Sequence, residues 1–168
     1  MSVRIILFFV ILVLDQWTKH LAAAHLTLGE PVPIIPGFFN LTLVYNPGAA
    51  FGMFSELSDG VRRITLGIVS AAALIVVIRF MMKEAKHDPV SQFALVGILS
   101  GAVGNLIDRY RFDSVVDFLD FYAARYHWPA FNVADSAISV GVCILLLRVL
   151  FAKAPDGQPA AVGDTPIP

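Results

Sequence analysis

Four apolar segments, each about as long as a membrane span, restrict what this chain can fold into more than any other feature of its sequence. They cover residues 3–24, 61–82, 90–107 and 134–151. A helix needs about 20 mostly apolar residues to cross about 30 Å of hydrocarbon. We therefore expect an all-α membrane protein with four transmembrane helices, in which both termini lie on the same side of the membrane.

The composition supports this interpretation and excludes other classes of protein. Hydrophobic residues make up 57% of the 168 residues and charged residues only 15%, against about 25% in ordinary soluble domains. A soluble core of this size cannot hide so much apolar surface behind so few charges. The formal net charge of -1 gives no electrostatic support for a nucleic-acid partner.

Metal and cofactor chemistry has little support in the residue pattern. Cys143 is the single cysteine, which excludes a disulfide framework and a multi-cysteine metal site. The four histidines are scattered, and the sequence has no HExxH motif, Walker A loop or GxGxxG loop. It also has no GxSxG nucleophile elbow. We expect neither a metal ion nor an organic cofactor.

The first segment has an alternative interpretation as a cleaved signal peptide. Arg4 precedes a ten-residue apolar run, and three alanines stand at residues 22–24, where a small-residue cleavage site would lie. The polar stretch from Asp15 to His20 separates this run from the alanines, which is a poor match for a neutral cleavage region. Because three further spans follow, a multi-pass protein is the simpler interpretation.

Two regions outside the spans lie on the same side of the membrane. Residues 28–58 contain a proline-rich run, aromatic and β-branched residues, and a turn at Asn46-Pro47-Gly48. As a working choice we place both termini in the cytoplasm, and on that choice the pattern predicts a small extracytoplasmic β-sheet on the membrane surface. Residues 117–126 predict a short extracytoplasmic helix, with aromatic residues at headgroup depth. We expect residues 1–151 to form a single membrane domain and the tail at 152–168 to be a disordered cytoplasmic end.

The third segment carries small residues at helical spacing. Gly97 and Gly101 form one GxxxG step, and Ser100 and Gly104 form a second step offset by three residues. Such spacing lets helix backbones approach closely in lipid, where no hydrophobic force drives helices together. We expect this stripe to be a helix-packing face.

Carboxylates at membrane depth most strongly suggest a function. A charged group near mid-bilayer costs at least about 2.5 kcal/mol, so such residues are rare and need partners. Asp15 has one, because Lys19 lies at i+4 on the same helix face. Asp117 and Asp135 each stand alone among apolar residues near the same membrane boundary. Each has a structural explanation in a helix cap, with Asn132 as the cap residue before Asp135.

Two such carboxyl groups brought together would favour a different chemistry. Adjacent carboxyl groups cannot both ionise cheaply, so they share a proton. A pair of this kind can deprotonate a water while it protonates a carbonyl oxygen, which is the chemistry of aspartic proteases. Two alternatives stay open. One is a proton-coupled carrier with Asp15 or Asp135 as its proton site, and the other is a non-catalytic scaffold in which every carboxylate is a cap or an ion pair.

The polar residues also form five motifs in a familiar order. These are Asp15-Gln16-Trp17-Thr18-Lys19, Asn46-Pro47-Gly48-Ala49-Ala50-Phe51-Gly52, Gly101-Ala102-Val103-Gly104-Asn105-Leu106-Ile107-Asp108-Arg109, Val116-Asp117-Phe118 and Phe131-Asn132-Val133-Ala134-Asp135-Ser136. On a four-span chain, this order resembles lipoprotein signal peptidase (signal peptidase II), a family of bacterial intramembrane aspartyl proteases. The resemblance covers residues 3–151. It departs at Ser100, where a glycine usually stands, and serine is small enough to keep the packing.

The resemblance implies that Asp117 and Asp135 are a catalytic dyad. It implies that further residues shape the site or contact the substrate: Asp15, Lys19, Asn46, Gly48, Asn105, Asp108, Arg109 and Asn132. Lysine and arginine residues divide equally between the two sides, so charge counting leaves the orientation open. The family has both termini in the cytoplasm of the bacterial inner (plasma) membrane and the active site near the extracytoplasmic face.

The resemblance also implies the substrate. It is a prolipoprotein whose lipobox cysteine already carries diacylglycerol, and cleavage before that cysteine releases the signal peptide. In the family, the surface sheet cradles the substrate and the short helix before the fourth span gates the site. We expect diacylglyceryl-prolipoproteins and membrane lipid as partners, no nucleic acid, and a monomeric enzyme.

Overall fold

The computed structural model describes residues 3–48, 57–83, 85 and 87–151. Within these residues the helices and strands follow one another as α1 (Val3–His25), β1 (Val32–Ile35), β2 (Phe39–Asn46), α2 (Asp59–Lys83), α3 (Pro89–Phe112), β3 (Val115–Ala123), β4 (Tyr126–His127) and α4 (Val133–Leu150). All four helices are long and apolar enough to cross a membrane. The expected transmembrane helices are therefore confirmed, whereas the tail at 152–168 lies outside the described residues.

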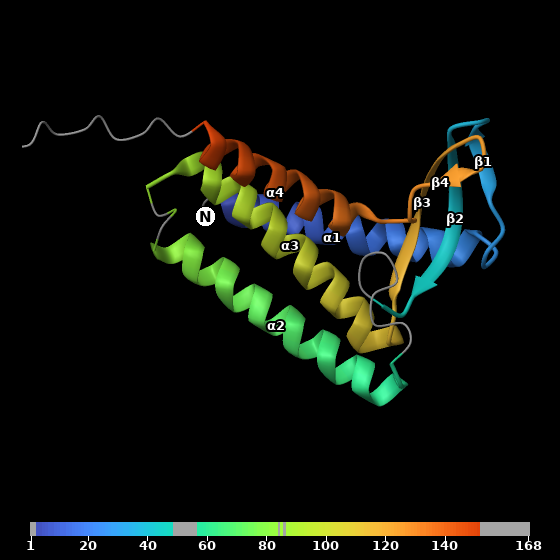
Figure 1. The fold of residues 1–168 in the computed structure, drawn as a ribbon, viewed down its shortest axis with the longest axis horizontal. Coiled ribbons are helices and arrows are strands. Elements are labelled where there is room, and N and C mark those ends of the chain that lie inside the picture. Colours follow the sequence, from blue (N-terminus) through green and yellow to red (C-terminus); the bar gives the residue numbers. More distant parts are fainter. Residues whose placement is uncertain (1–2, 49–56, 84, 86, 152–168) are drawn as a thin grey trace, which may run out of the picture.

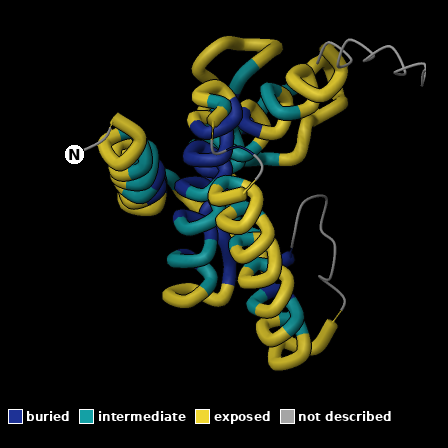
Figure 2. Tube along the Cα trace, turned by 90° about the vertical axis from the view of Figure 1, so that its left-hand side faces the viewer, coloured by how far each residue is buried: buried dark blue, intermediate teal, exposed yellow. Residues whose placement is uncertain are grey.

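Helix α3 forms the centre of the bundle. It packs against α4, α1 and α2, and it carries most of the buried helical residues. Figure 1 shows α2 running along α3, and in Figure 2 the buried turns run through the middle of the molecule while the outer helices are mostly exposed. The bundle therefore has a narrow core around one helix.

Small residues let α1 and α4 approach α3 closely. A Cβ added to Gly101 would collide with the backbone carbonyl of Ala134. A Cβ added to Gly104 would lie 2.5 Å from Asp15 Oδ2. Both approaches occur where α3 meets polar groups of its neighbours, and neither leaves room for a larger side chain. The predicted packing face on this helix is confirmed.

The strands form one sheet beside the bundle, in the order β1-β2-β3-β4 with antiparallel neighbours. In Figure 1 this sheet stands as an arm next to α1 and the start of α4. It is attached to the helices through β3, because β3 follows α3 after a two-residue turn and contacts both α1 and α3.

A β-bulge in β2 decides which of its side chains face the bundle. Asn40 pairs with Asp120, and Asn46 pairs with Val115, the same-face neighbour of Asp117 on β3. Between these two pairs the register shifts. Without the shift, Asn40 and Asn46 would lie on the same face of the strand, since they are an even number of residues apart. The bulge therefore sends the two asparagines to opposite faces, toward different aspartates.

The predicted short helix at residues 117–126 is wrong. Val115–Ala123 form strand β3 and Tyr126–His127 form strand β4. The segment is rich in valine, phenylalanine and tyrosine, which pack well on a pleated surface, and β2 supplies an antiparallel partner. The sheet expected from residues 28–58 is present as β1 and β2, but half of its strands come from the region before α4. Residues 49–56 lie outside the described part of the chain.

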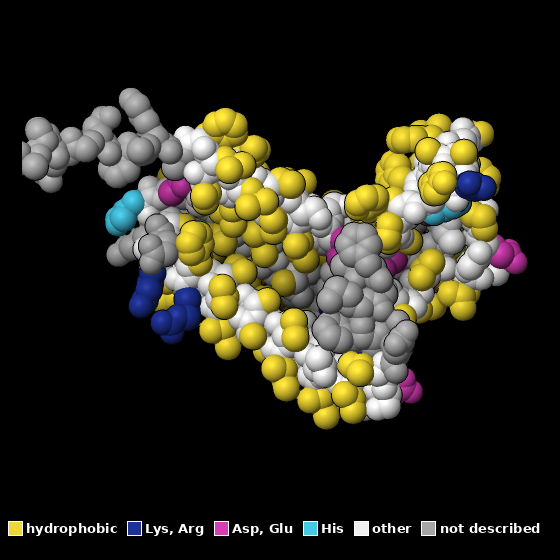
Figure 3. Space-filling view, viewed as in Figure 1, with side chains coloured by type: hydrophobic (Ala, Val, Ile, Leu, Met, Phe, Trp, Pro, Cys, Tyr) yellow, Lys and Arg dark blue, Asp and Glu magenta, His cyan; other side chains and the backbone are white. Residues whose placement is uncertain are grey.

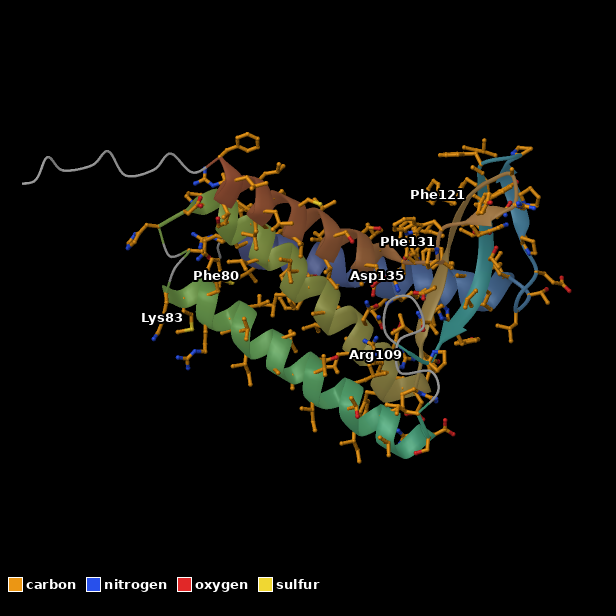
Figure 4. The ribbon with its side chains drawn as sticks, in the orientation of Figure 1. Phe80, Lys83, Arg109, Phe121, Phe131 and Asp135 are labelled. Carbon is orange, nitrogen blue, oxygen red and sulfur yellow. The ribbon has the colours of Figure 1, made fainter. Side chains whose placement is uncertain are left out.

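The outer surface of the helices is apolar, as a lipid-facing surface must be. Phe9 of α1, Ile68 of α2 and Val149 of α4 are 54%, 64% and 74% exposed. Figure 3 shows hydrophobic side chains along the helices, with Lys and Arg side chains at the end away from the sheet and on the sheet itself. Lys83, labelled in Figure 4, ends α2 there.

A set of polar contacts, here named the terminal clamp, joins the helices at this same end. Asp88 caps α3 and accepts hydrogen bonds from Arg148 Nη2 and Nε at 2.9 and 3.2 Å. The buried Gln92 side chain accepts a bond from Arg4 Nη1 at 2.8 Å and donates to the Met81 carbonyl at 2.6 Å. The clamp thus links α1, α2, α3 and α4 far from the sheet.

Candidate active site

Asp117 and Asp135, here called the carboxyl pair, lie at the junction between the sheet and the bundle. Asp117 is buried on β3, and Asp135 is in the first turn of α4. Figure 4 shows Asp135 at the end of α4 that faces the sheet. Both residues line one cavity of about 930 Å³. The fold therefore brings two carboxyl groups from different elements to the same cavity.

The walls of this cavity are mostly apolar. They comprise Val44, Tyr45, Pro47, Val115, Trp128, Pro129, Ala130, Phe131, Ile138 and Val140. Phe131 stacks on Phe121 of β3 with 5.7 Å between the ring centroids, so this wall is fixed against the sheet (Figure 4). A largely apolar pocket with a few convergent polar groups is typical of a binding site.

Asparagine amides hold both members of the carboxyl pair. Asn132 Nδ2 donates to Asp117 Oδ1 at 2.7 Å, and Asn46 Nδ2 donates to Asp117 Oδ2 at 3.1 Å. Asn105 Nδ2 donates to Asp135 Oδ1 at 2.7 Å. Asn132 also caps α4, because its Oδ1 accepts the Asp135 backbone N–H at 2.9 Å. These amides orient the carboxyl groups without adding charge to the site.

Asp117 can exchange a proton near neutral pH. Burial and the negative charge of Asp135 raise the pKa of its carboxyl from 3.8 to about 7. The hydrogen bonds from Asn46 and Asn132 and the positive charge of Lys19 lower this pKa, but they do not outweigh the increase. A group with a pKa near the working pH can both give and take a proton during a reaction.

Three charged residues form a buried ion cluster behind the carboxyl pair: Asp15, Lys19 and Asp108. Lys19 Nζ lies 2.9 Å from Asp15 Oδ2 and 3.0 Å from Asp108 Oδ2. Asp15 Oδ1 accepts the backbone N–H of Ala134 at 2.8 Å, one residue before Asp135. The cluster therefore ties α1 and α3 to the start of α4.

The same cluster anchors the strand that carries Asp117. Asp108 Oδ2 accepts the backbone N–H of Val116 at 3.1 Å. Gln16 Nε2 donates to Asp108 Oδ1 at 3.0 Å and to the Gly104 carbonyl at 3.2 Å. Sequence reasoning did not single out Gln16, and the signal that pointed to it was its place in the first motif.

Arg109 reaches the cavity from the end of α3 (Figure 4). Its Nη2 donates to the Gly48 carbonyl at 3.3 Å, and the Gly48 N–H donates to Asn46 Oδ1 at 3.0 Å. Arg109 Nε is buried and has no hydrogen-bond partner within the described residues. An unsatisfied buried donor costs about 1–3 kcal/mol, which a bound acceptor would recover.

Comparison with known proteins shows which family the chain belongs to. The family model for signal peptidase (SPase) II matches residues 7–151. The chain belongs to the signal peptidase II family. It is 50% identical over 147 residues to the lipoprotein signal peptidase of Desulforapulum autotrophicum. This match covers 88% of this chain and 91% of that relative. It is 44% identical over 140 residues to the lipoprotein signal peptidase of Syntrophus aciditrophicus, over 83% of this chain and 87% of the relative.

Solved structures agree with this family membership. Two structures described as bacterial membrane enzymes match the fold with TM-scores of 0.80 and 0.77, each at 31% sequence identity. The first match covers 93% of this chain and 94% of that chain, and the second covers 89% and 94%. This member of the signal peptidase II family is therefore a protease and a multi-pass bacterial membrane protein.

The fold brings the predicted site residues of this family member together in three layers. Asp117, Asp135, Asn46, Asn105 and Arg109 line the cavity, Asn132 and Gly48 bond to residues that line it, and Asp15, Lys19 and Asp108 form the ion cluster behind it. Sequence reasoning missed the cavity walls. It placed the aromatic residues of the region before α4 only at headgroup depth, although Trp128 and Phe131 of that region line the cavity. Within the described residues, no group of three or more His, Cys, Asp or Glu side chains has the arrangement of a metal site.

Proposed function

We propose that this chain is an aspartic endopeptidase that removes the signal peptide from diacylglyceryl-modified prolipoproteins by cleaving before the lipidated cysteine. The observation that carries the proposal is the carboxyl pair, Asp117 and Asp135, which lines one largely apolar cavity with an asparagine amide on each member. Such surroundings favour a pair that shares one proton. The relatives are named lipoprotein signal peptidases, which supports the substrate class.

The carboxyl pair performs hydrolysis by moving protons. One member, as the carboxylate, takes a proton from a water, and the water oxygen bonds to the carbonyl carbon of the scissile peptide. The other member gives its proton to the carbonyl oxygen, so the tetrahedral intermediate is uncharged. The pair then protonates the leaving nitrogen and takes back a hydroxyl proton as the C–N bond breaks. Because the two groups titrate together, the acid and base roles belong to the pair.

Neutral and positive donors around the pair position the substrate. Arg109 Nε, which has no hydrogen-bond partner among the residues that the structure describes, donates to a carbonyl oxygen of the bound peptide or of the glyceryl ester. The apolar walls of the cavity hold the residues on either side of the scissile bond. No step requires a metal ion.

The membrane delivers the substrate to the cavity. Ile138 and Val140 of α4 line it, and Val140 is also 59% exposed on the outer surface of the helices. Each CH₂ group kept in lipid contributes about 0.8 kcal/mol, so the acyl chains stay in the bilayer and hold the scissile bond near its boundary. We place both termini in the cytoplasm, which puts the sheet and the carboxyl pair near the extracytoplasmic face.

A cleavage assay in detergent micelles tests this proposal. The substrate is a diacylglyceryl-modified prolipoprotein, and the enzymes are wild type, Asp117→Asn, Asp135→Asn and the matched control Asp120→Asn. Asp120 is also buried on β3 and hydrogen-bonded by an asparagine, but it does not line the cavity. We expect the first two substitutions to lower kcat by about 10²–10⁴-fold, because each removes a proton-transfer group. Asp120→Asn should keep cleavage, and EDTA should not inhibit it.

Two results would contradict the proposal. If folded Asp117→Asn or Asp135→Asn cleaves at the wild-type rate, that residue has only a structural role and the dyad is wrong. If folded wild type does not cleave the lipidated substrate at all, the proposed substrate class is wrong, and this protease acts on a different peptide.

A further inference from the structure

Lys19 makes one contact that charge balance does not require. Its side chain is 3% exposed, and its three N–H groups have three acceptors at 2.8–3.0 Å: Asp15 Oδ2, Asp108 Oδ2 and Asn105 Oδ1. The two carboxylates already compensate its charge. The third acceptor is the uncharged carboxamide oxygen of Asn105, and a buried ammonium bonded to that oxygen restrains the whole planar amide.

This restraint reaches the carboxyl pair through the other end of the same amide. Asn105 Nδ2 donates to Asp135 Oδ1 at 2.7 Å. If the amide were reversed, its NH₂ group would face the Lys19 ammonium and its oxygen would face the Asp135 carboxylate. Both contacts would be repulsive in surroundings of low dielectric constant. Lys19 and Asp135 therefore select one orientation of Asn105.

A second amide depends on the first. Asn132, which is fully buried, donates through Nδ2 to Asn105 Oδ1 at 3.3 Å and to Asp117 Oδ1 at 2.7 Å. With its oxygen turned toward Lys19, Asn105 also presents an acceptor to Asn132. The Asn105 carboxamide thus links two groups: its nitrogen donates to Asp135, and its oxygen accepts from Asn132, which holds Asp117. Lys19 anchors that oxygen.

We propose that Lys19 is a positioning residue of the active site, which acts through Asn105 and aims the amide NH₂ group at Asp135. The inference rests on the proposed role of the carboxyl pair. Lys19 does not line the cavity, so it influences the geometry of the reacting groups and not the binding of substrate. Its loss should lower kcat and leave KM nearly unchanged.

The variants must separate positioning from charge balance. Lys19→Met keeps the length of the side chain but leaves Asp15 and Asp108 buried with no cation, and such an imbalance can prevent folding. The second variant, Lys19→Met/Asp108→Asn, removes one positive and one negative charge, so the net charge of the buried ion cluster stays as in wild type. Asp108→Asn alone is its reference.

Ser100→Ala is the matched control for helix packing. The buried Ser100 hydroxyl of α3 donates to the Phe8 carbonyl of α1 at 2.7 Å, so it joins the same two helices as Lys19 but does not contact the ion cluster. If Lys19 only packs α1 against α3, both substitutions should lower the melting temperature and change kcat alike. If Lys19 positions Asn105, only its loss should lower kcat strongly, by about 10²-fold.

A double-mutant cycle tests whether the effect passes through Asn105. Asn105→Ala is introduced into Asp108→Asn and into Lys19→Met/Asp108→Asn. We expect Asn105→Ala to lower kcat much less in the second background, because the amide there is already misaligned. The pH profile of kcat should also be displaced when Lys19 is lost. If the loss of Lys19 only lowered the fraction of folded enzyme, kcat would fall by the same factor at every pH and the profile would not shift along the pH axis.

A spectroscopic measurement reads the amide without any cleavage. The chain has four asparagines, Asn40, Asn46, Asn105 and Asn132, so ¹⁵N-asparagine labelling yields few side-chain amide resonances, and Asn105→Ala identifies its own pair. In Lys19→Met/Asp108→Asn the Asn105 resonances should move relative to Asp108→Asn, while those of Asn40, which bonds to Asp120 on the other face of the sheet, should stay.

The outcomes distinguish failure of the inference from failure of the proposed function. Unmoved Asn105 resonances in a folded charge-balanced variant, or a kcat equal to that of Asp108→Asn, would overturn the positioning role. Moved Asn105 resonances in a protein whose wild type cleaves nothing would support the positioning of Asn105 and contradict only the proposed function.

Discussion

Two aspartates on β3, three residues apart, are both buried and behave in opposite ways. Asp117 is 2% exposed and Asp120 is 6% exposed. Burial and the charge of Asp135 raise the pKa of Asp117 to about 7. Burial also acts to raise the pKa of Asp120, but hydrogen bonds from Asn40 and His127 and the charge of His127 bring it below its ordinary value.

The contrast teaches that neighbours, and not burial alone, decide whether a buried carboxyl holds a proton. Both aspartates accept a bond from an asparagine on β2, Asn46 for Asp117 and Asn40 for Asp120. The difference lies in the ionisable group that each aspartate faces. Across the cavity Asp117 meets another acid, whereas Asp120 Oδ1 lies 2.8 Å from the Nδ1 of His127. One face of the strand is suited to proton transfer and the other to holding the sheet together.

The largest expected difference in kcat comes from removing one asparagine that bonds to Asp117 and, separately, one that bonds to Asp120. Asn132→Ala removes one of the two asparagine donors to Asp117 and the cap that holds the Asp135 N–H, so we expect kcat to fall by about 10²-fold or more. Asn40→Ala removes a donor to Asp120 and should cost about 1–2 kcal/mol of stability with little change in kcat. Cleavage assays and thermal melts of the purified variants measure both effects.

The comparison breaks if the two variants lose activity equally. Equal losses would mean that the sheet as a whole, and not its cavity face, sets the rate. Adding Asn132→Ser, which keeps an uncharged oxygen acceptor for the Asp135 N–H but removes the amide donor, separates the loss of the cap from the loss of the bond to Asp117.

Stability should depend on pH in opposite directions on the two faces. The pKa of Asp117 is higher in the folded than in the unfolded protein, so its contribution is fully present below about pH 4 and is lost as the pH rises through 7. The change is on the order of 4 kcal/mol. The lowered pKa of Asp120 gives the reverse sign, because its contribution is present above about pH 4 and is lost as the pH falls.

Melting temperatures at pH 2, 4, 6 and 8 test both signs. Relative to wild type, Asp117→Asn should become more stable as the pH rises from 4 to 8. Asp120→Asn should become less stable, relative to wild type, as the pH rises from 2 to 4. If the difference in melting temperature between wild type and Asp117→Asn does not change between pH 4 and 8, Asp117 ionises as an ordinary carboxyl group.

The smallest expected effect lies at the other end of the bundle, in the terminal clamp. Asp88 has a pKa lowered to about 2 by its bond from the Ser91 hydroxyl and, next, by the bond and charge of Arg148, which outweigh burial. Its contribution to stability is therefore present above about pH 4 and is lost as the pH falls through 2. Asp88→Asn should lower the melting temperature slightly at pH 7 and not at pH 2, with kcat unchanged. A changed kcat would mean that the clamp is coupled to the carboxyl pair.

Much of the fold follows from properties of single sequence segments, such as their length, hydropathy and residue spacing. Span length and hydropathy predict the four helices, and small-residue spacing predicts the packing face around Gly101, because each depends on residues within one segment. The i+4 spacing of Asp15 and Lys19 likewise predicts their ion pair, which the structure contains at 2.9 Å. The wrong helix at residues 117–126 shows the limit, since a strand needs a partner and β2 lies far away in the sequence.

The residues of the candidate site were named from the sequence, but their connections were not. Nothing in the motif that contains Asn105 indicates that its oxygen faces Lys19 and its nitrogen faces Asp135. The bulge in β2 is also invisible in the sequence, although it decides that Asn46 and not Asn40 reaches Asp117. Such contacts join elements that are distant along the chain, and only packing selects among them.

The two aspartates of β3 show which properties the sequence determines and which the tertiary structure determines. Both stand among valine, leucine and phenylalanine in Val115–Ala123, and the sequence by itself predicted a carboxyl group in apolar surroundings at Asp117, whereas it did not single out Asp120. Only the tertiary structure decided that Asp117 meets Asp135 and that Asp120 meets His127. The physical reason is that burial acts on both carboxyl groups in the same direction, whereas the sign of the neighbouring charge depends on which element the fold packs against each face.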